Sequence, residues 1–171
     1  MKKNSGGDPA RRFPLFISLS GKRILIVGGG KIAARRAKTL IDGQFGVEIQ
    51  VVSPALGQEM EALFCGKMEN VPLSWVQTVY DDSFLTEVDM VLACTDRPEI
   101  NRRVYEDCRK KHILVNVASD QSLCDFHFPG ILIEEDVVIA FNGGGVDHKK
   151  VKQLRRQIGA WLNSRKSGNT D

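Results

Sequence analysis

Short apolar runs alternate with longer amphipathic stretches through the first two thirds of the chain. Residues 24–27 form a continuous run of β-branched and leucine side chains, which is typical of a strand buried on both faces of a parallel sheet. The stretch that follows repeats small and aliphatic residues at helical spacing and predicts a helix. Its buried face is expected to comprise Ala33, Ala37, Leu40 and Ile41. Arg36 and its charged neighbours are expected to point away from the core.

The same alternation continues to about residue 117. Further strands are predicted at 47–52, 73–79, 88–94 and 113–117. Between them lie a helix at 56–64, a helical turn at 81–85 and a helix that begins at Pro98, since proline is tolerated in a first helical turn. Strands that alternate with helices predict a doubly wound parallel sheet of α/β class, here over residues 13–117.

After residue 117 the pattern changes. Strands are predicted at 124–128, 131–133 and 137–141 with no helix between them, and the acidic residues 134–136 suit a hairpin turn. We expect a small antiparallel unit over 118–146 that serves as a subunit interface, because an isolated hairpin is marginally stable in water. A final helix is predicted from about residue 147, within a basic segment at 147–166. Its apolar stripe comprises Val151, Leu154, Ile158, Trp161 and Leu162.

A glycine motif connects the first strand to the first helix. Gly28, Gly30 and Ala33 fill the Gly-x-Gly-x-x-Gly/Ala pattern, in which the glycines permit a tight turn and a close approach of the backbone to a pyrophosphate. This Rossmann-type arrangement predicts a dinucleotide site, and the alternative is a plain βαβ turn. The residues expected to contact the cofactor here are Gly28, Gly29, Gly30, Lys31, Ile32 and Ala33.

The end of the second strand lacks the acidic residue that usually binds the ribose hydroxyls. Ser53 and Pro54 stand there, and we expect Ser53 and the backbone around Pro54 and Ala55 to hold the ribose instead. No arginine stands at this strand end to attract a 2′-phosphate. The sequence therefore favours NAD over NADP.

Polar residues after the fourth and fifth strands are candidates for chemistry, because ligands of open α/β sheets bind beyond the carboxyl ends of the strands. The group Cys94-Thr95-Asp96-Arg97 is expected to line the cofactor cleft, although Asp96 also suits a helix cap. Asp120 is a candidate proton acceptor, with an Asx turn as the alternative. His127 lies between two aromatic residues, where a packing role competes with proton transfer.

A second glycine-rich loop precedes the basic final helix. Asn142, Gly143 and Gly144 follow a predicted strand, and Lys149 and Lys150 begin the helix. Such a loop and its cations suit a substrate that carries several carboxylates. The alternative is a solvated charged face.

The composition narrows the class of protein. The formal net charge of +3 over 171 residues is too small to indicate nucleic-acid binding. No apolar run approaches the length of a membrane span, and the polar start is not a signal peptide. Four cysteines without a Cys-x-x-Cys pair predict free thiols in a reducing cytoplasmic setting rather than disulfides or zinc ligands.

These motifs together resemble the precorrin-2 dehydrogenase family, the NAD-dependent module of siroheme synthase. The resemblance covers about residues 13–162. The matching segments are 13–16, 21–33, 51–54, 93–96 with Asn101, 116–118, 123–129 and the glycine loop at Gly143. It implies oxidation of precorrin-2, a tetrapyrrole with many carboxylates, to sirohydrochlorin with NAD⁺ as hydride acceptor. It also implies a homodimer and, in some members, insertion of Fe²⁺.

Two positions depart from the family pattern. Ser119 stands where the family carries its catalytic aspartate, so that Asp120, Asp96 and His127 become the candidates for acid–base chemistry, in that order. The glycine loop also differs from the family's substrate loop. These departures motivate an alternative function, a non-catalytic module that binds NAD or a tetrapyrrole.

Overall fold

The computed structural model describes residues 13–66, 71–143 and 148–166, with the side chains of 148 and 166 excepted. Two compact units divide the chain: Ser18–Phe128 forms one, and the described parts of Met1–Ile17 and Pro129–Asp171 form the other. Each unit is described by itself.

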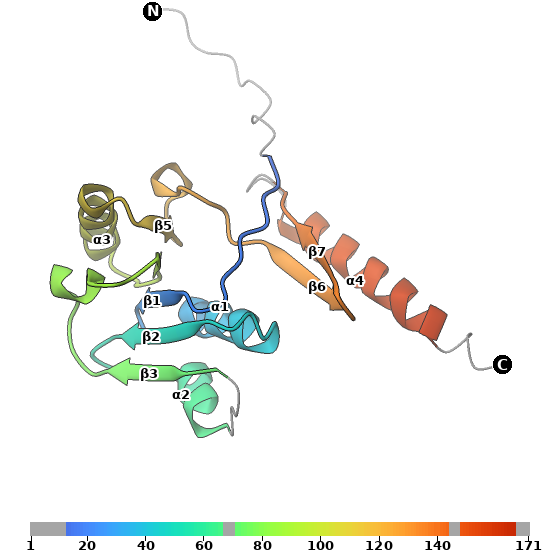
Figure 1. The fold of residues 1–171 in the computed structure, drawn as a ribbon, viewed down its shortest axis with the longest axis horizontal. Helices are drawn as coiled ribbons and strands as arrows, with labels where there is room; N and C mark the ends of the chain where they lie inside the picture. Colours follow the sequence, from blue (N-terminus) through green and yellow to red (C-terminus); the bar gives the residue numbers. More distant parts are fainter. Residues whose placement is uncertain (1–12, 67–70, 144–147, 167–171) are drawn as a thin grey trace, which may run out of the picture. The chain divides into compact units, whose positions relative to one another are not determined.

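The larger unit is built on a five-stranded parallel sheet with the strand order β3-β2-β1-β4-β5 (Figure 1). The strands are β1 Arg23–Val27, β2 Glu48–Val52, β3 Leu73–Val76, β4 Met90–Ala93 and β5 Leu114–Val117. In the register, Val27 at the end of β1 pairs with Val52 of β2 and with Ala93 of β4. The three central strands therefore end at the same level of one sheet edge.

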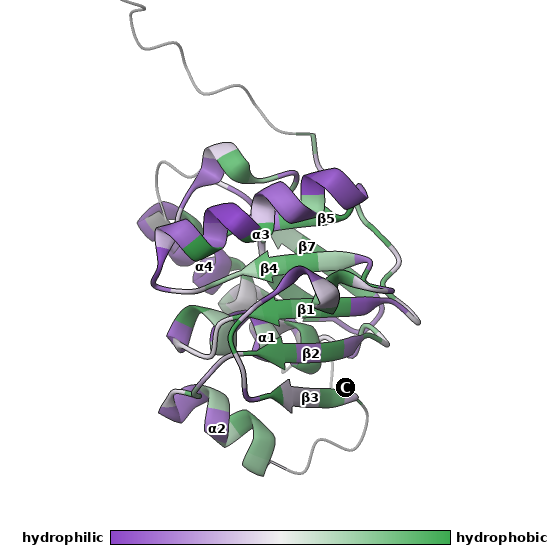
Figure 2. Cartoon of the chain, turned by 90° about the vertical axis from the view of Figure 1, so that its left-hand side faces the viewer, coloured by the Kyte–Doolittle hydropathy of each residue, from purple (hydrophilic) through white to green (hydrophobic). Residues whose placement is uncertain are grey.

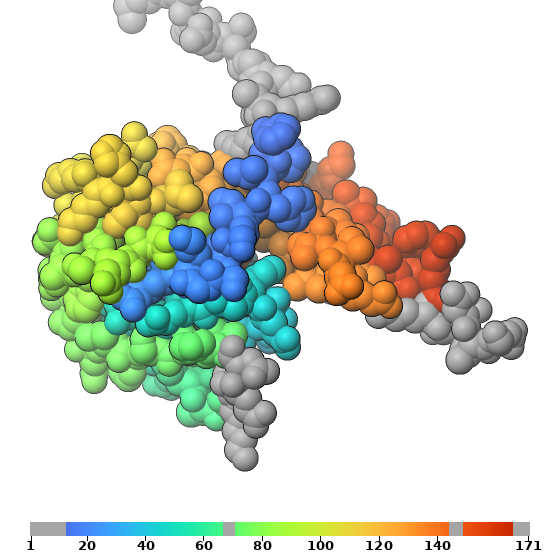
Figure 3. Space-filling model, viewed as in Figure 1, coloured from blue at the N-terminus to red at the C-terminus, as the bar shows by residue number. Residues whose placement is uncertain are grey.

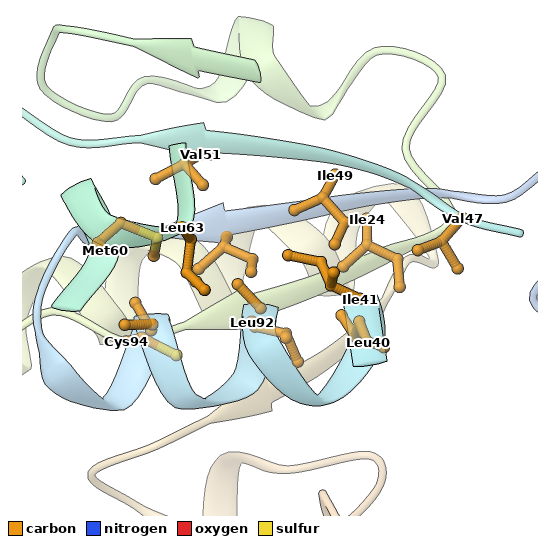
Figure 4. Close-up of a cluster of buried hydrophobic side chains, with 14 of the residues drawn as sticks. Ile24, Leu40, Ile41, Val47, Ile49, Val51, Met60, Leu63, Leu92 and Cys94 are labelled. Carbon is orange, nitrogen blue, oxygen red and sulfur yellow. The ribbon is translucent and has the colours of Figure 1, made fainter. Parts of the chain in front are cut away.

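Helices cover both faces of this sheet. They are α1 Lys31–Asp42, α2 Gln58–Cys65 and α3 Pro98–Lys111, joined by the 3₁₀ turns η1 Asp82–Leu85 and η2 Gln121–Leu123. One core cluster lies between the sheet and α1 and α2, where Ile49 and Leu92 point toward Leu40 and Ile41 (Figure 4). A second cluster lies on the opposite face, where Val91 and Val104 pack between the sheet and α3. β4 is accordingly apolar along its length, β1 is apolar after its first residue, and α3 is largely hydrophilic on its outer side (Figure 2).

The predicted doubly wound α/β fold is thus confirmed, and β1, α1 and α3 lie where the hydrophobic pattern placed them. The predicted strand at 124–128 is wrong, because that segment has no regular structure beyond η2. Side chains take the hydrogen bonds that a strand ladder would use: the Asp125 carboxylate accepts from the Val115 amide, and the Asn116 amide donates to the Phe126 carbonyl. The segment therefore crosses the end of β5 as irregular chain.

The expected outward orientation of Arg36 is also wrong. Its side chain is buried, with 8% of its surface exposed. The guanidinium donates to the Cys94 sulfur at 3.4 Å and lies over the Phe128 ring at 5.4 Å from the centroid. The long stem and the planar head of arginine can pack against apolar and aromatic groups, which a count of charged positions does not anticipate.

The smaller unit consists of an antiparallel hairpin and one helix. Strands β6 Gly130–Glu134 and β7 Val137–Phe141 pair antiparallel around a two-residue turn, in which Glu135 has φ 51°. Helix α4 His148–Lys166 lies alongside β6, and Arg155 donates to the Ile131 carbonyl at 3.2 Å (Figure 3). The predicted hairpin and final helix are confirmed. Within the described ranges, no helix is long and apolar enough to cross a membrane.

Candidate functional site

A cleft of about 630 Å³ opens at the carboxyl edge of the parallel sheet. It lies in the larger unit, at the position where β1 and β4 are neighbours and the helices that follow them cover opposite faces. This is the topological switch point at which open α/β sheets bind ligands. Its wall includes Gly28, Gly29, Gly30, Lys31, Ile32, Ser53, Pro54, Ala55, Leu56, Val79, Tyr80, Thr95, Asp96, Arg97 and Ile100. Of the residues predicted to contact a cofactor, only Ala33 is missing from this wall, since it lies on the fully buried face of α1.

The three glycines after β1 have different structural roles. Gly28 has φ 114°, and a Cβ built there would lie 2.8 Å from the Cys94 carbonyl oxygen. A Cβ at Gly29 would overlap the Ala55 carbonyl oxygen. A Cβ at Gly30 would meet nothing within 4 Å, and its backbone is extended with φ −83°. The fold therefore requires glycine at 28 and 29, whereas the third glycine keeps space free within the cleft.

The amino end of α1 supplies a favourable field for an anion. Gly30 is the N-cap and makes no side-chain cap, and the first turn holds no acidic residue. The first amide bonded within the helix is that of Ala34, to the Gly30 carbonyl at 2.9 Å. The preceding amides therefore face the cleft with the positive end of the helix dipole, which is the arrangement that binds phosphates. The open space at Gly30 and these amides fit a pyrophosphate.

The loop after β2 forms the wall expected at the ribose. Ser53 is buried, and its hydroxyl donates to the Ala55 carbonyl at 2.6 Å. The Trp75 indole donates to the Ser53 carbonyl at 3.0 Å, and the Gly57 amide donates to the Gly29 carbonyl at 2.9 Å. These bonds hold the loop against the glycine turn. The Ser53 oxygen keeps acceptor capacity, but its proton is already engaged.

The loop after β4 brings one carboxylate to the cleft. Asp96 is exposed and lines the wall beside Thr95. The N-cap of α3 is Arg97, without a side-chain cap bond, so the alternative role of Asp96 as the helix cap is not realised. Thr95 is held by Asn101, a buried residue of α3.

The loop after β5 places Ser119 and Asp120 outside the wall of the cleft. Ser119 is exposed, and its oxygen accepts a hydrogen bond from the Asn101 amide at 3.0 Å. The Asp120 carboxylate accepts from the Ser122 hydroxyl at 2.6 Å and from the Ser122 amide at 2.9 Å. Both bonds lower the pKa of the Asp120 carboxyl, the hydroxyl bond most. The geometry is that of the cap of η2, the local role weighed against proton transfer.

Tyr80 is the residue of this wall that carried no sequence signal, because its apolar sequence context indicates only a core position. It is buried in the wall, its hydroxyl donates to Asp107 at 3.4 Å, and burial is the main cause that raises its pKa. Cys94 lines the cleft as expected, and burial raises the pKa of its thiol against the opposing effect of Arg36.

The remaining predicted site residues do not line this cleft. His127 is half-buried in the irregular segment after η2. Asn142 and Gly143 are exposed after β7, Lys149 and Lys150 are exposed on α4, and all four belong to the smaller unit. Gly144 lies outside the described residues. Among the residues that the structure describes, no group of histidine, cysteine and acidic side chains is arranged to hold a metal ion.

Known proteins match both the sequence and the fold. A family model described as "Putative NAD(P)-binding" matches residues 15–130. The chain is 37% identical over 86% of its length to "Probable multifunctional siroheme biosynthesis protein HemA" of Ruminiclostridium josui, and 34% identical over 88% to "Siroheme synthase" of Photorhabdus laumondii. It spans only 28% and 31% of the lengths of these relatives.

A solved structure shares the fold. The protein "SirC, precorrin-2 dehydrogenase" superimposes with a TM-score of 0.69 at 23% sequence identity. The match covers 87% of this chain and 70% of the other. At this level of identity the likeness concerns the fold.

Proposed function

Because the chain belongs to the NAD(P)-binding family of the siroheme synthases and precorrin-2 dehydrogenases, we propose that it oxidises precorrin-2 to sirohydrochlorin with NAD⁺. The observation that carries this proposal is the cleft at the switch point, with its open space at Gly30 and free amides at the start of α1. When bound, NAD⁺ would accept the hydride that leaves the substrate.

NAD is the proposed cofactor rather than NADP. Residues 53–57, which follow β2 and line the cleft where a 2′-phosphate would lie, include no lysine or arginine, and Lys31 of α1 pairs with Glu59 at 3.7 Å. The first turn of α2, which begins beside that loop, carries Glu59 and Glu61. Their negative charges oppose a phosphate near this helix end. A lower affinity for NADP is the expected result.

The oxidation removes a hydride and a proton, so a proton acceptor is needed beside the reacting carbon. Asp96 is the carboxylate that lines the cleft, and it is solvent-exposed. Asp120 lies at the next strand end, with its carboxylate engaged by Ser122. Asp96 is our first candidate for the proton acceptor and Asp120 the second, which reverses the order that the sequence favours.

The substrate carboxylates would be bound by Lys149 and Lys150 of α4, both exposed. The smaller unit also exposes apolar side chains, with 89% of Phe13, 58% of Val137 and 54% of Trp161 accessible. A hairpin with one helix buries little apolar surface on its own. We therefore propose that this unit forms the contact of a homodimer, which sedimentation of the full chain over a range of concentrations would test.

An anaerobic assay of NADH formation from precorrin-2 tests the function directly. If the protein is a dehydrogenase, NADH and sirohydrochlorin should form in equal amounts, and NAD⁺ should be preferred to NADP⁺. NAD binding by calorimetry without any turnover would instead identify a non-catalytic NAD-binding module. That outcome is favoured by the engagement of Asp120 and the serine at position 119.

A further inference from the structure

A single buried amide joins the two loops at the reacting end of the cleft. Asn101 lies in the first turn of α3 with 1% of its surface exposed. It contacts Thr95 after β4 and Ser119 after β5, two residues that belong to different strand ends. Because these loops carry Asp96 and Asp120, the position of both candidate carboxylates depends on this link.

Every hydrogen-bonding group of the Asn101 side chain is used. Its oxygen accepts from the Thr95 amide at 3.1 Å and lies 2.8 Å from the Thr95 hydroxyl, which shares its one proton between this oxygen and the Arg97 carbonyl at 3.0 Å. Its nitrogen donates to the Thr95 carbonyl at 3.0 Å and to the Ser119 hydroxyl oxygen at 3.0 Å. An asparagine can make two bonds at each of these atoms. A buried amide that is fully satisfied holds its neighbours in one arrangement.

The orientation of the amide is fixed by the backbone of Thr95. A backbone N–H can only donate and a carbonyl can only accept, so the Asn101 oxygen must face the first and its nitrogen the second. The nitrogen must then donate to Ser119. The Ser119 oxygen is an acceptor in this bond, and its own proton has no acceptor among the described residues. Since Ser119 is exposed, that proton is free to be donated to water or to a bound ligand.

We propose that Asn101 is a positioning residue that locks the loops after β4 and β5 together and orients the Ser119 hydroxyl as a hydrogen-bond donor to the substrate. The inference rests on the proposed function. It gives Ser119 a role in binding the substrate, while the carboxylate of another residue accepts the proton. Ser119 binds and orients a substrate acceptor group, and the proton leaves to a carboxylate.

The two ends of the amide can be separated by substitution. Asn101→Asp keeps an oxygen that accepts from the Thr95 amide and loses both donor bonds, the one to the Thr95 carbonyl and the one to Ser119, whose proton then turns inward to the new carboxylate. Asn101→Ala loses both ends. Ser119→Ala removes the hydroxyl donor alone, and Ser119→Thr keeps the hydroxyl. Thr39→Ala is a matched control, since it removes a hydroxyl that bonds the Arg35 carbonyl on the exposed side of α1.

These variants should differ from one another in turnover but not in NAD affinity. Asn101→Asp and Ser119→Ala should each lower kcat about tenfold, the effect of one hydrogen bond, with NAD affinity near wild type. The double variant should fall no further than either single change, because both remove the same donor. Ser119→Thr, which keeps the hydroxyl, should lose less kcat than Ser119→Ala, and Thr39→Ala should keep kcat. Wild-type turnover by Ser119→Ala, or additive losses in the double variant, would overturn the role of Ser119.

Amide hydrogen exchange tests the lock without any turnover. The Thr95 amide should be protected in the wild type and in Asn101→Asp, and should exchange about tenfold faster in Asn101→Ala. Equal exchange in all three proteins would overturn the lock. If the wild type forms no NADH, the proposed dehydrogenase fails, and the exchange rates still decide whether Asn101 holds the loops. Should Asn101→Asp not fold, the Ser119 pair decides the orientation of the hydroxyl.

Discussion

Replacing Gly30 by valine should abolish NAD binding and leave the larger unit folded. The backbone of Gly30 is extended, with φ −83° and ψ −173°, a conformation that any residue adopts. A Cβ there would meet no atom of the protein within 4 Å. The new side chain would occupy only the space that the pyrophosphate needs in order to reach the amides of α1.

The size of the effect follows from the bonds that would be lost. A hydrogen bond to a charged group contributes about 1.5–3 kcal/mol. Losing two amide–phosphate bonds at the start of α1 would therefore weaken binding by about 10²–10⁴-fold. The free energy of unfolding should change by less than about 1 kcal/mol, because restricting the unfolded chain offsets the poorer N-cap. Gly30→Ala should show a smaller loss of affinity.

Two other glycines give the same chemical change in different surroundings. Gly28→Ala places a Cβ at φ 114° and 2.8 Å from the Cys94 carbonyl oxygen, so it should destabilise the fold by several kcal/mol, of which strain alone is about 1–3 kcal/mol. Gly159→Ala lies in α4, where the nearest atom would be Leu132 at an ordinary 3.6 Å. It should raise the stability of the helix slightly and leave NAD affinity unchanged.

Calorimetric titration with NAD⁺ and thermal unfolding of the same samples would check this set. The expected pattern is weak binding with a normal melting temperature for Gly30→Val, and a low melting temperature for Gly28→Ala. If Gly30→Val melts normally and binds NAD⁺ as tightly as the wild type, the loop after β1 does not hold a pyrophosphate.

Three further predictions address the chemistry and the charge. Asp96→Asn should lower kcat about 10²–10⁴-fold with NAD affinity retained, whereas a loss confined to Asp120→Asn would move the proton acceptor to the β5 loop. Lys149→Gln with Lys150→Gln should raise KM for precorrin-2 at low salt, and the difference from wild type should shrink as salt screens the cations; equal KM values would leave a solvated face. Burial raises the pKa of the Cys108 thiol to about 12. The neutral thiol therefore contributes to the free energy of unfolding at pH values below the ordinary thiol pKa, and this contribution is lost as pH rises toward 12. Cys108→Ala should therefore flatten the alkaline loss of stability in denaturant titrations, and an unchanged slope would contradict that cause.

The parallel sheet and its helices could be predicted because each element carries its own periodic signal. The central strands are buried on both faces, so they read as continuous apolar runs, and α1 and α3 present one apolar stripe each. The preference for right-handed crossovers determines which face of the sheet each connecting helix covers, but not where the strand order reverses. The carboxyl edge could still be located without any three-dimensional information.

The hydrogen bonds within the site could not be predicted in the same way. Asn101 lies one residue from a position that lines the cleft, yet its four bonds depend on the distance between two loops that are far apart in sequence. The hydrogen bond from Ser122 to Asp120 is local and could have been weighed more heavily, since a serine two residues after an aspartate often donates to its carboxylate. Local hydrogen bonds therefore decide which candidate carboxylate is available to accept a proton.

The two structural errors have one physical origin. On the α1 side of the sheet, the chain after η2 covers the region near β5 without forming a helix or a strand, and Phe126 and Phe128 pack there against the core. A cover of irregular chain leaves polar backbone groups to be satisfied by side chains, as Asn116 does for the Phe126 carbonyl. It also leaves a gap of the right shape for the stem of Arg36, whose charged head then meets a ring and a thiol instead of water. The apolar run at 124–128 was interpreted as a strand, and Arg36 as a solvated position on a helix. Both interpretations are wrong because irregular chain covers the sheet at this place.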